Sequence, residues 1–136
     1  MSPLDALFEA AAEAQARAYA PYSGFKVGAA VLGQGGAVYA GCNVENAAYP
    51  VATCAEAAAI AVMVAAGETR IAAVLVVGEG EALVTPCGAC RQRIREFAAG
   101  DAAVHVAGPG GVRRSFALDE LLPFSFGPDN LPSGRP

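Results

Sequence analysis

Three thiols and one carboxylate occupy two short segments of this chain, and they constrain its fold more than any other feature. Residues 53–56 read Thr-Cys-Ala-Glu, and residues 86–90 read Pro-Cys-Gly-Ala-Cys. Cys87 and Cys90 are three residues apart, which places both thiols on one face of a helix. Cys54 precedes an apolar, Ala-rich run that also predicts a helix. We therefore expect a fold in which two helix starts point at one spot.

Three thiolates can hold a zinc ion and leave its fourth tetrahedral position open, as in catalytic zinc sites. The candidate ligands are Cys54, Cys87 and Cys90, and the positive ends of two helices would favour their thiolate forms. Glu56 is the candidate general acid and base beside the open position. Two other interpretations remain from the residues alone. Cys87 and Cys90 could form a redox pair, or Cys42 could add a fourth ligand and close the site into a structural zinc centre.

Local signals predict where these two helices begin and end. Thr53 is the candidate N-cap of the first helix, and Pro86 suits the first turn of the second. Gly67 is expected to end the first helix and Gly100 the second. The first helix has almost no polar face, which predicts that it is buried on nearly all sides.

The whole chain, residues 1–136, is expected to form one domain. A capped helix over residues 3–18 opens it, and a short helix over residues 119–122 follows the last strand. Five strands are expected, at residues 25–32, 37–44, 71–77, 102–107 and 112–116. The first two are joined by a Gly-rich turn and should be antiparallel, whereas the third and fourth are separated by a helix and should be parallel. This order predicts a mixed α/β sheet with helices on its faces.

Composition excludes several classes of function. The net charge of −4 argues against a nucleic-acid groove, which needs a basic face. No apolar run approaches the length that spans a bilayer, and the N-terminus lacks the pattern of a signal peptide. We therefore expect a cytoplasmic protein, whose thiols serve a metal or catalysis. The hydrophobic fraction of 54% favours a chain that buries surface in an oligomer.

Two further features carry weaker signals. Asn43, Glu45 and Asn46 cluster at the end of the second strand. Such a cluster forms either a turn bonded to its own backbone or part of a binding site. The single histidine, His105, has apolar neighbours in the fourth strand, so we expect a partly buried or edge histidine rather than a zinc ligand.

These motifs resemble those of the small homotetrameric zinc-dependent cytidine deaminases, over nearly the whole chain. The matching segments are Ala-Pro-Tyr-Ser at 20–23, Phe-Lys-Val-Gly-Ala-Ala at 25–30, Gly-Cys-Asn-Val-Glu-Asn-Ala-Ala-Tyr at 41–49, Cys-Gly-Ala-Cys-Arg-Gln at 87–92, Leu-Leu-Pro at 121–123 and Phe-Gly-Pro at 126–128. The resemblance implies a three-layer α-β-α fold, with helices on both faces of a mixed five-stranded sheet, and one Zn²⁺ per subunit. It also implies hydrolytic deamination of cytidine and 2′-deoxycytidine to uridine and 2′-deoxyuridine, with release of ammonia, as in pyrimidine salvage.

The same resemblance implies roles for individual residues. Glu56 would take a proton from the attacking water, deliver it to N3 of the ring and later protonate the leaving amine. Seven residues would contact the nucleoside: Phe25 at the pyrimidine ring, Asn43 and Glu45 at the ribose 3′-hydroxyl, Ala55 at the base, and Ala48, Tyr49 and Phe126 in the pocket of a neighbouring subunit. The implied partners are a small nucleoside and further copies of the chain, and neither nucleic acid nor membrane.

The chain departs from the family pattern beside the metal site. The family commonly has an Arg directly after the Glu, where it donates to the zinc thiolates, and here the residue is Ala57. Three thiolates and one Zn²⁺ sum to one negative charge, which weakens the metal as a Lewis acid. The helix N-termini must then offset more of that charge, or Arg91 or Arg93 must approach the thiolates.

Two other functions remain open. A deaminase of a modified cytosine nucleoside, of the blasticidin S type or acting on an N4-substituted cytidine, would share the zinc motifs and tolerate an apolar residue after the Glu. A zinc-stabilised binding module without turnover would have no use for Glu56 beside an open metal position.

Overall fold

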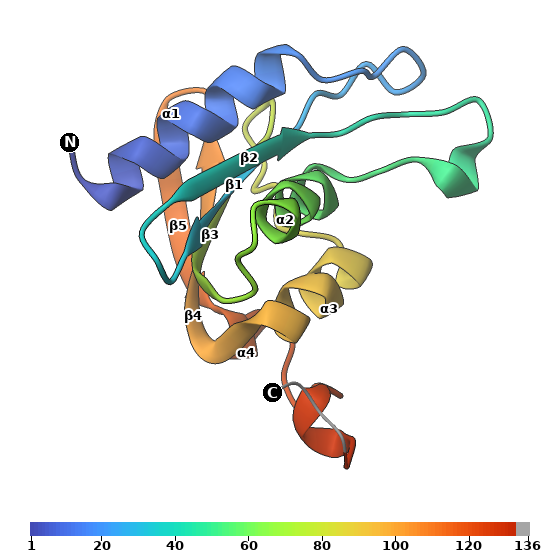
Figure 1. Cartoon of the computed structure of the whole chain (residues 1–136). Helices are drawn as coiled ribbons and strands as arrows, with labels where there is room; N and C mark the ends of the chain where they lie inside the picture. Colours follow the sequence, from blue (N-terminus) through green and yellow to red (C-terminus); the bar gives the residue numbers. More distant parts are fainter. Residues whose placement is uncertain (133–136) are drawn as a thin grey trace.

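A mixed five-stranded sheet with the strand order β2-β1-β3-β4-β5 forms the middle layer of a computed structural model that describes residues 1–132 (Figure 1). The strands are β1 (Gly28–Gly33), β2 (Val38–Cys42), β3 (Ile71–Val77), β4 (Ala98–Gly108) and β5 (Gly111–Ala117). The helices are α1 (Pro3–Ala16), α2 (Ala55–Ala65), α3 (Gly88–Phe97) and α4 (Leu118–Leu121), with short 3₁₀ turns η1 (Tyr49–Val51) and η2 (Pro128–Asn130). Neighbouring strands are antiparallel except β3 and β4, which run parallel, so the expected mixed sheet is confirmed.

Helices cover the sheet from both sides, as Figure 1 shows. Leu7 and Ala11 of α1 are buried against one face. Met63 of α2, Ile94 of α3 and Leu118 of α4 are buried against the other. Burial of one such large aliphatic side chain stabilises the fold by about 1.5–3 kcal/mol, so both layers are held mainly by apolar packing. The three-layer α-β-α architecture expected from the sequence is therefore confirmed.

Two glycines let the helices approach the backbone of the sheet. A Cβ atom built on Gly28 would lie 2.0 Å from the carbonyl oxygen of Ala11 in α1, and one built on Gly41 would lie 2.5 Å from the backbone nitrogen of Ala59 in α2. Both distances are far below an ordinary van der Waals contact, so a larger residue would push the helix away. Gly41 thus sets how closely α2, which carries Cys54 at its start, approaches the sheet.

Helix α1 begins as the sequence predicts and ends earlier. Ser2 and Asp5 form a capping box, with each side chain accepting from the other residue's backbone N–H. The helix stops at Ala16 because Tyr19 leaves it to pair with Val44, accepting from the backbone of Glu45.

The predicted end of α3 at Gly100 is wrong. The helix ends at Phe97, because Ala98 already pairs with Ile71 of β3 and begins the strand β4 four residues earlier than expected. Gly100 lies instead within β4, where a Cβ atom would collide with the carboxylate of Asp119. Gly67 follows α2 with a φ of +95°, as expected of a glycine that ends a helix.

Helix α2 is not buried on nearly all sides, contrary to expectation. Val62 and Val64 are 47% and 42% exposed, and as residues two apart on a helix they point in different directions. Within one chain the sheet covers a single face of this helix, so its remaining apolar surface faces outward.

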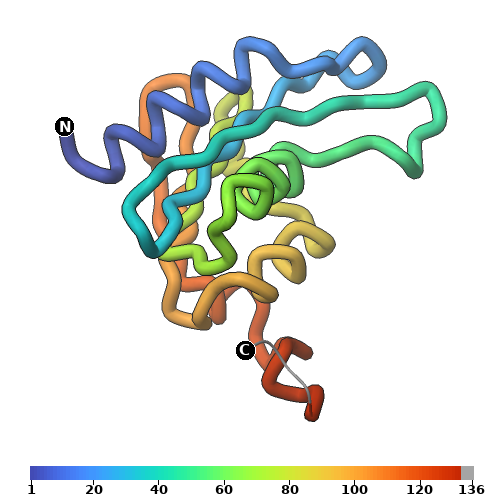
Figure 2. The backbone as a smooth tube through the Cα atoms, in the orientation of Figure 1, coloured from blue at the N-terminus to red at the C-terminus, as the bar shows by residue number. Residues whose placement is uncertain are grey.

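Two segments project from the three-layer body, one between β2 and α2 that carries η1, and the C-terminal segment that carries η2 (Figures 1 and 2).

His105 lies in β4, half-buried, with its Nδ1 atom 2.6 Å from the hydroxyl of Ser115 in β5. The histidine is therefore the partly buried one that the sequence predicts. Among the described residues, no helix has the length and apolar character needed to cross a membrane.

Candidate metal centre and active site

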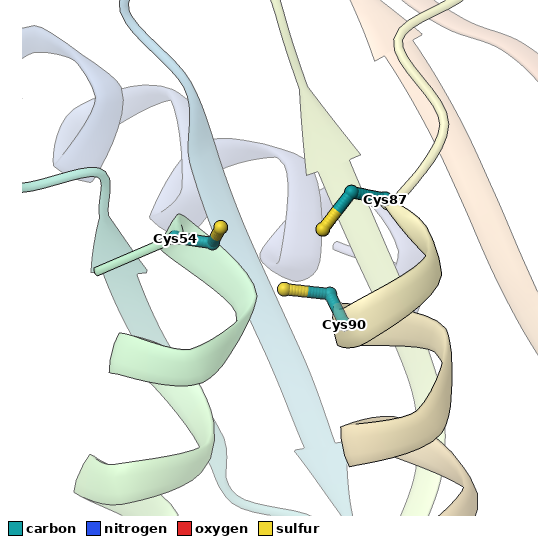
Figure 3. Close-up of side chains that lie close together, drawn as sticks. All are labelled: Cys54, Cys87 and Cys90. Carbon is teal, nitrogen blue, oxygen red and sulfur yellow. The ribbon is translucent and has the colours of Figure 1, made fainter. Parts of the chain in front are cut away.

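The three predicted ligand thiols converge between the starts of α2 and α3 (Figure 3). The Sγ atoms of Cys54, Cys87 and Cys90 all lie within 4.8 Å of one another. Tetrahedral zinc with Zn–S bonds of about 2.3 Å separates its sulfur ligands by roughly 3.8 Å. The cluster thus fits Zn²⁺ with small side-chain adjustments and leaves one position open.

Two of the ligands are the N-cap residues of their helices. Cys54 has φ −77° and ψ 156° before α2, and Cys87 has φ −65° and ψ 166° before α3. The predictions that Thr53 caps α2 and that Pro86 lies in the first turn of α3 are therefore wrong. Thr53 is unavailable because its backbone N–H and C=O both pair with Val44, at 2.9 Å. Both helix N-termini consequently start at a thiol, and their partial positive charges favour anions there.

Burial and mutual repulsion work against ionising all three thiols together. Burial raises the pKa of Cys54, and the negative charge of Cys87 adds to this. Burial and the negative charge of Glu56 raise the pKa of Cys90 far above its usual range. Burial acts to raise the pKa of Cys87 as well. Hydrogen bonds from the backbone of Cys90 and from the neighbouring thiols outweigh this effect and lower the pKa of Cys87. A bound cation would relieve this repulsion, since metal ligation deprotonates thiols.

Glu56 is buried beside the thiols, with 4% of its surface exposed. Burial raises the pKa of its carboxyl group, while hydrogen bonding with Cys90 and attraction from Arg93 act in the opposite direction. A buried carboxyl with a raised pKa exchanges protons more readily near neutral pH than an exposed one. The structure thus places Glu56 in the thiol cavity, and its role as general acid and base stays a prediction.

A cavity of about 200 Å³ joins the thiols to two of the predicted substrate contacts. Its lining residues are Val27, Asn43, Cys54, Ala55, Glu56, Val76, Val84, Thr85 and Cys87. Small-molecule sites usually enclose about 300–1,000 Å³, so this cavity suits a base better than a whole nucleoside. A second cavity of about 380 Å³ includes Glu45 and Asn46, close along the chain to Asn43.

Sequence reasoning missed four residues of the first cavity: Val27, Val76, Val84 and Thr85. Three of them are valines, which carry no chemical signal of a site. Thr85 directly precedes Pro86 and the ligand Cys87, and this adjacency could have identified it. Arg113 of β5 steadies the loop that carries Val84 and Thr85, because it donates to the carbonyl oxygens of Gly80 and Ala82, at 2.7 and 3.3 Å.

The other predicted ring and ribose contacts, Phe25 and Glu45, do not line the thiol cavity. Phe25 is joined by a hydrogen bond to Asn43, which does line it, and Glu45 lines the second cavity. The side-chain amide of Asn43 donates a hydrogen bond to the backbone carbonyl of Phe25. Glu45 accepts hydrogen bonds from the backbone N–H groups of Tyr22 and Ser23 and from the Ser23 hydroxyl. The Ser23 hydroxyl and these N–H groups lower the pKa of Glu45. Glu45 is thus an ionised carboxylate held against the loop that precedes β1.

Ala48, Tyr49 and Phe126 do not line the thiol cavity of their own chain. All three are exposed, and they lie on the two projecting segments. Tyr49 contacts Tyr22 edge-on, with ring centroids 5.9 Å apart. Their predicted contact with the pocket of a neighbouring subunit stays a prediction.

Cys42 lies on the far side of the sheet from the thiol cluster. Val38 and Ala40 of β2 pack into the apolar cluster beneath α1, and Cys42 follows at the same strand periodicity. Gly41, between them, faces α2 instead. Among the described residues, the thiol group that can hold a metal comprises Cys54, Cys87 and Cys90 without Cys42. The described residues therefore do not form a structural zinc centre with Cys42 as its fourth ligand.

Comparisons with known proteins agree with this geometry. The family model described as the cytidine and deoxycytidylate deaminase zinc-binding region matches residues 1–106. The cytidine deaminase of Sporosarcina psychrophila is 42% identical over 119 residues, which cover 88% of each chain. A crystal structure of the cytidine deaminase from Burkholderia pseudomallei superposes with a TM-score of 0.85 and 45% identity, over 93% of this chain and all of that one. The structure of the Mycobacterium tuberculosis cytidine deaminase gives a TM-score of 0.77 and 39% identity, over 90% of this chain and 96% of that one. The chain therefore belongs to the family of zinc-binding cytidine and deoxycytidylate deaminases.

Proposed function

We propose that this chain catalyses the zinc-dependent hydrolytic deamination of cytidine and 2′-deoxycytidine, which yields uridine or 2′-deoxyuridine and ammonia. The observation that carries the proposal is the shared cavity of Cys54, Cys87 and Glu56, in which a buried carboxyl adjoins three convergent thiols. A structural zinc site would need a fourth ligand and would have no use for that carboxyl. The similarity to cytidine deaminases over most of the chain supports the same reaction.

Different side chains of the cavity have different roles in the proposed reaction. Zinc held by the three thiolates would supply a Lewis acid and lower the pKa of a nearby water. Glu56 takes a proton from the attacking water and delivers it to N3 of the ring. It then takes the remaining proton from the hydroxyl group on C4 and passes it to the amine, so that the C4 carbonyl forms as the bond between C4 and that nitrogen breaks and ammonia leaves. Val27, Val76 and Val84 provide apolar walls that limit further water around the ring.

Substrate recognition is assigned to the residues beside this cavity. The ring of Phe25 packs on the pyrimidine, and the backbone of Ala55 meets the base. Asn43 and Glu45 bind the ribose 3′-hydroxyl. Because hydrogen bonds keep Glu45 ionised, its charge would repel a phosphate and favour nucleosides over nucleotides. The net charge of −4 likewise supports a small substrate over a nucleic acid.

The proposed active assembly is a homotetramer in which neighbouring subunits complete each site. The exposed apolar side chains of α2, Val62 and Val64, support burial against another copy. Ala48, Tyr49 and Phe126 would then enter a neighbour's pocket from the projecting segments. We place the enzyme in the cytoplasm, where the compartment keeps such thiols reduced.

The test is the loss of ultraviolet absorbance when cytidine or 2′-deoxycytidine is incubated with the zinc-loaded protein. The variant Glu56→Gln should retain zinc and lose about 10²–10⁴-fold in kcat, the usual contribution of a general acid or base. The variant Glu9→Gln makes the same chemical change on the exposed face of α1 and should retain full activity.

The remaining outcomes separate the alternatives. Ala57 lines a groove between α2 and α3 rather than the thiol cavity, so its small side chain does not enlarge the substrate site for a modified cytosine. Turnover of an N4-substituted cytidine or of blasticidin S without turnover of cytidine would nonetheless replace the proposed substrate. A zinc-loaded protein that consumes none of these compounds would instead be a binding module.

A further inference from the structure

The metal centre of the proposed function has an excess of negative charge. Three thiolates around one Zn²⁺ leave one negative charge, and the carboxyl group of Glu56 lies in the same cavity. Helix α2, which carries Cys54 and Glu56, contains no basic residue. A cation that offsets this charge must therefore come from another element, and α3 carries three arginines: Arg91, Arg93 and Arg95.

Two of these arginines are engaged elsewhere. Arg91 donates to the carbonyl oxygens of Pro86 and Leu121, both at 2.7 Å, and to the Thr85 hydroxyl at 3.1 Å. Arg95 donates to the Ser125 hydroxyl at 3.0 Å and pairs with Asp129 at 3.4 Å. Within residues 1–132, these partners of Arg91 and Arg95 are oxygen atoms rather than ligand sulfurs, and they tie α3 to the segments around it.

Arg93 approaches the thiols. Its Nη1 atom lies 3.5 Å from the Sγ atom of Cys90, within hydrogen-bond distance for sulfur. The two residues are three apart on α3, so the contact lies along one helix face.

The facing helix leaves room for this side chain. Ala57 is three residues after Cys54 on α2, the same spacing that separates Arg93 from Cys90. Ala57 and Arg93 line one groove between the two helices. The small side chain of Ala57 on α2 thus lies across the groove from the long side chain of Arg93 on α3. The guanidinium of Arg93 reaches the thiol group at Cys90.

We propose that Arg93 is the electrostatic partner of the metal centre in this chain, donating to the Cys90 thiolate and offsetting the net negative charge of the zinc–thiolate group. This inference rests on the zinc site of the proposed function. Partners that orient or stabilise metal ligands are typically worth 10–100-fold in metal affinity. Arg93 is here a positioning residue, since it acts through Cys90.

The experiment measures metal binding without substrate. Zn²⁺ affinity is determined by chelator competition for the wild type, Arg93→Gln and Arg93→Lys. We expect Arg93→Gln to bind Zn²⁺ about tenfold more weakly, at the low end of the range for such partners, and Arg93→Lys to lose less because it keeps the charge. The matched control is Arg114→Gln, which removes the same charge from β5, where Arg114 stacks on Phe116.

A second readout distinguishes electrostatics from structure. Co²⁺ replaces Zn²⁺, and the sulfur-to-cobalt charge-transfer band is recorded. Loss of an N–H···S bond raises the energy of the sulfur lone pairs, so Arg93→Gln should move the band to longer wavelength while Arg114→Gln leaves it in place. Adding Ala57→Arg to Arg93→Gln supplies a guanidinium from the facing helix and should restore both the affinity and the band.

Two results would overturn the inference. One is an Arg93→Gln protein with the Zn²⁺ affinity and Co²⁺ band of Arg114→Gln. The other is weaker Zn²⁺ binding with no band shift and no recovery in the double variant, which would mean that Arg93 only supports the helix. Because both readouts use metal alone, a wild type that fails to deaminate cytidine would overturn the proposed function without altering these results.

Discussion

The side-chain amide of Asn43 donates a hydrogen bond to the carbonyl oxygen of Phe25, over 2.9 Å. The same amide accepts from the backbone N–H of Val27, also at 2.9 Å. One side chain therefore ties the end of β2 to the segment that leads into β1. The contact holds the proposed ring-packing residue beside the proposed ribose contact, at the edge of the cavity that contains the thiols.

Asn43→Asp should weaken substrate binding without unfolding the protein. The new carboxylate can still accept from Val27, but its second oxygen faces the carbonyl oxygen of Phe25 and repels it. Loss of one hydrogen bond and a new repulsion amount to about 1.4 kcal/mol, or roughly a tenfold rise in KM for cytidine. Steady-state kinetics would measure this, with Gln34→Glu in the exposed β1–β2 turn as the control for the added charge. An unchanged KM in Asn43→Asp would contradict the assignment.

Arg91→Gln should destabilise the metal-free protein, in contrast to Arg93→Gln. It would leave the carbonyl oxygens of Pro86 and Leu121 without their charged donor. Each such loss costs about 1–3 kcal/mol for a buried group, and these sites are partly buried, so we expect a total of about 2–3 kcal/mol. Urea unfolding of the metal-free proteins would measure it. Equal midpoints for Arg91→Gln and Arg93→Gln would show that Arg91 does not anchor the start of α3.

Gly41→Ala should displace α2 and weaken metal binding. The added methyl group would lie 2.5 Å from the backbone nitrogen of Ala59, so the helix must shift, at a cost of about 1–3 kcal/mol. Cys54 would move with it, and Zn²⁺ affinity should fall together with the thermal midpoint. Gly110→Ala is the matched control, because a Cβ atom there meets nothing within 4 Å. Wild-type behaviour of both variants would mean that α2 does not depend on this close approach.

The single histidine offers a pH-dependent test of the fold. Burial lowers the pKa of His105 below its ordinary value of 6.5. As the pH falls below 6.5 the unfolded chain binds the proton first, so the free energy of unfolding should decrease until the pH passes below the folded-state pKa. An NMR titration of the one imidazole would give that pKa directly, and His105→Gln should remove this part of the pH dependence. A folded-state pKa above 6.5 would reverse the sign and refute the prediction.

Local spacing determined much of this protein from the sequence alone. The N-cap of the first helix at Ser2 and the shared face of Cys87 and Cys90 each depend on residues close in sequence, and such relations survive in any fold that keeps the helix. The alternation of strand and helix likewise predicted the mixed sheet. The residue types of the metal site indicated zinc with an open position, but they left a redox pair and a closed structural centre as alternatives.

Tertiary packing decided the features that residue spacing in the sequence cannot predict. Arg91 and Arg93 are two residues apart on one helix, yet the first contacts backbone carbonyls and the second a thiol, because successive helical positions face different neighbours. Cys42 was a possible fourth ligand until the sheet placed it beneath α1, and α3 ends at Phe97 because β3 supplies a partner for Ala98. Each of these outcomes depends on contacts between segments distant in sequence, whose geometry only the packed sheet and helices define.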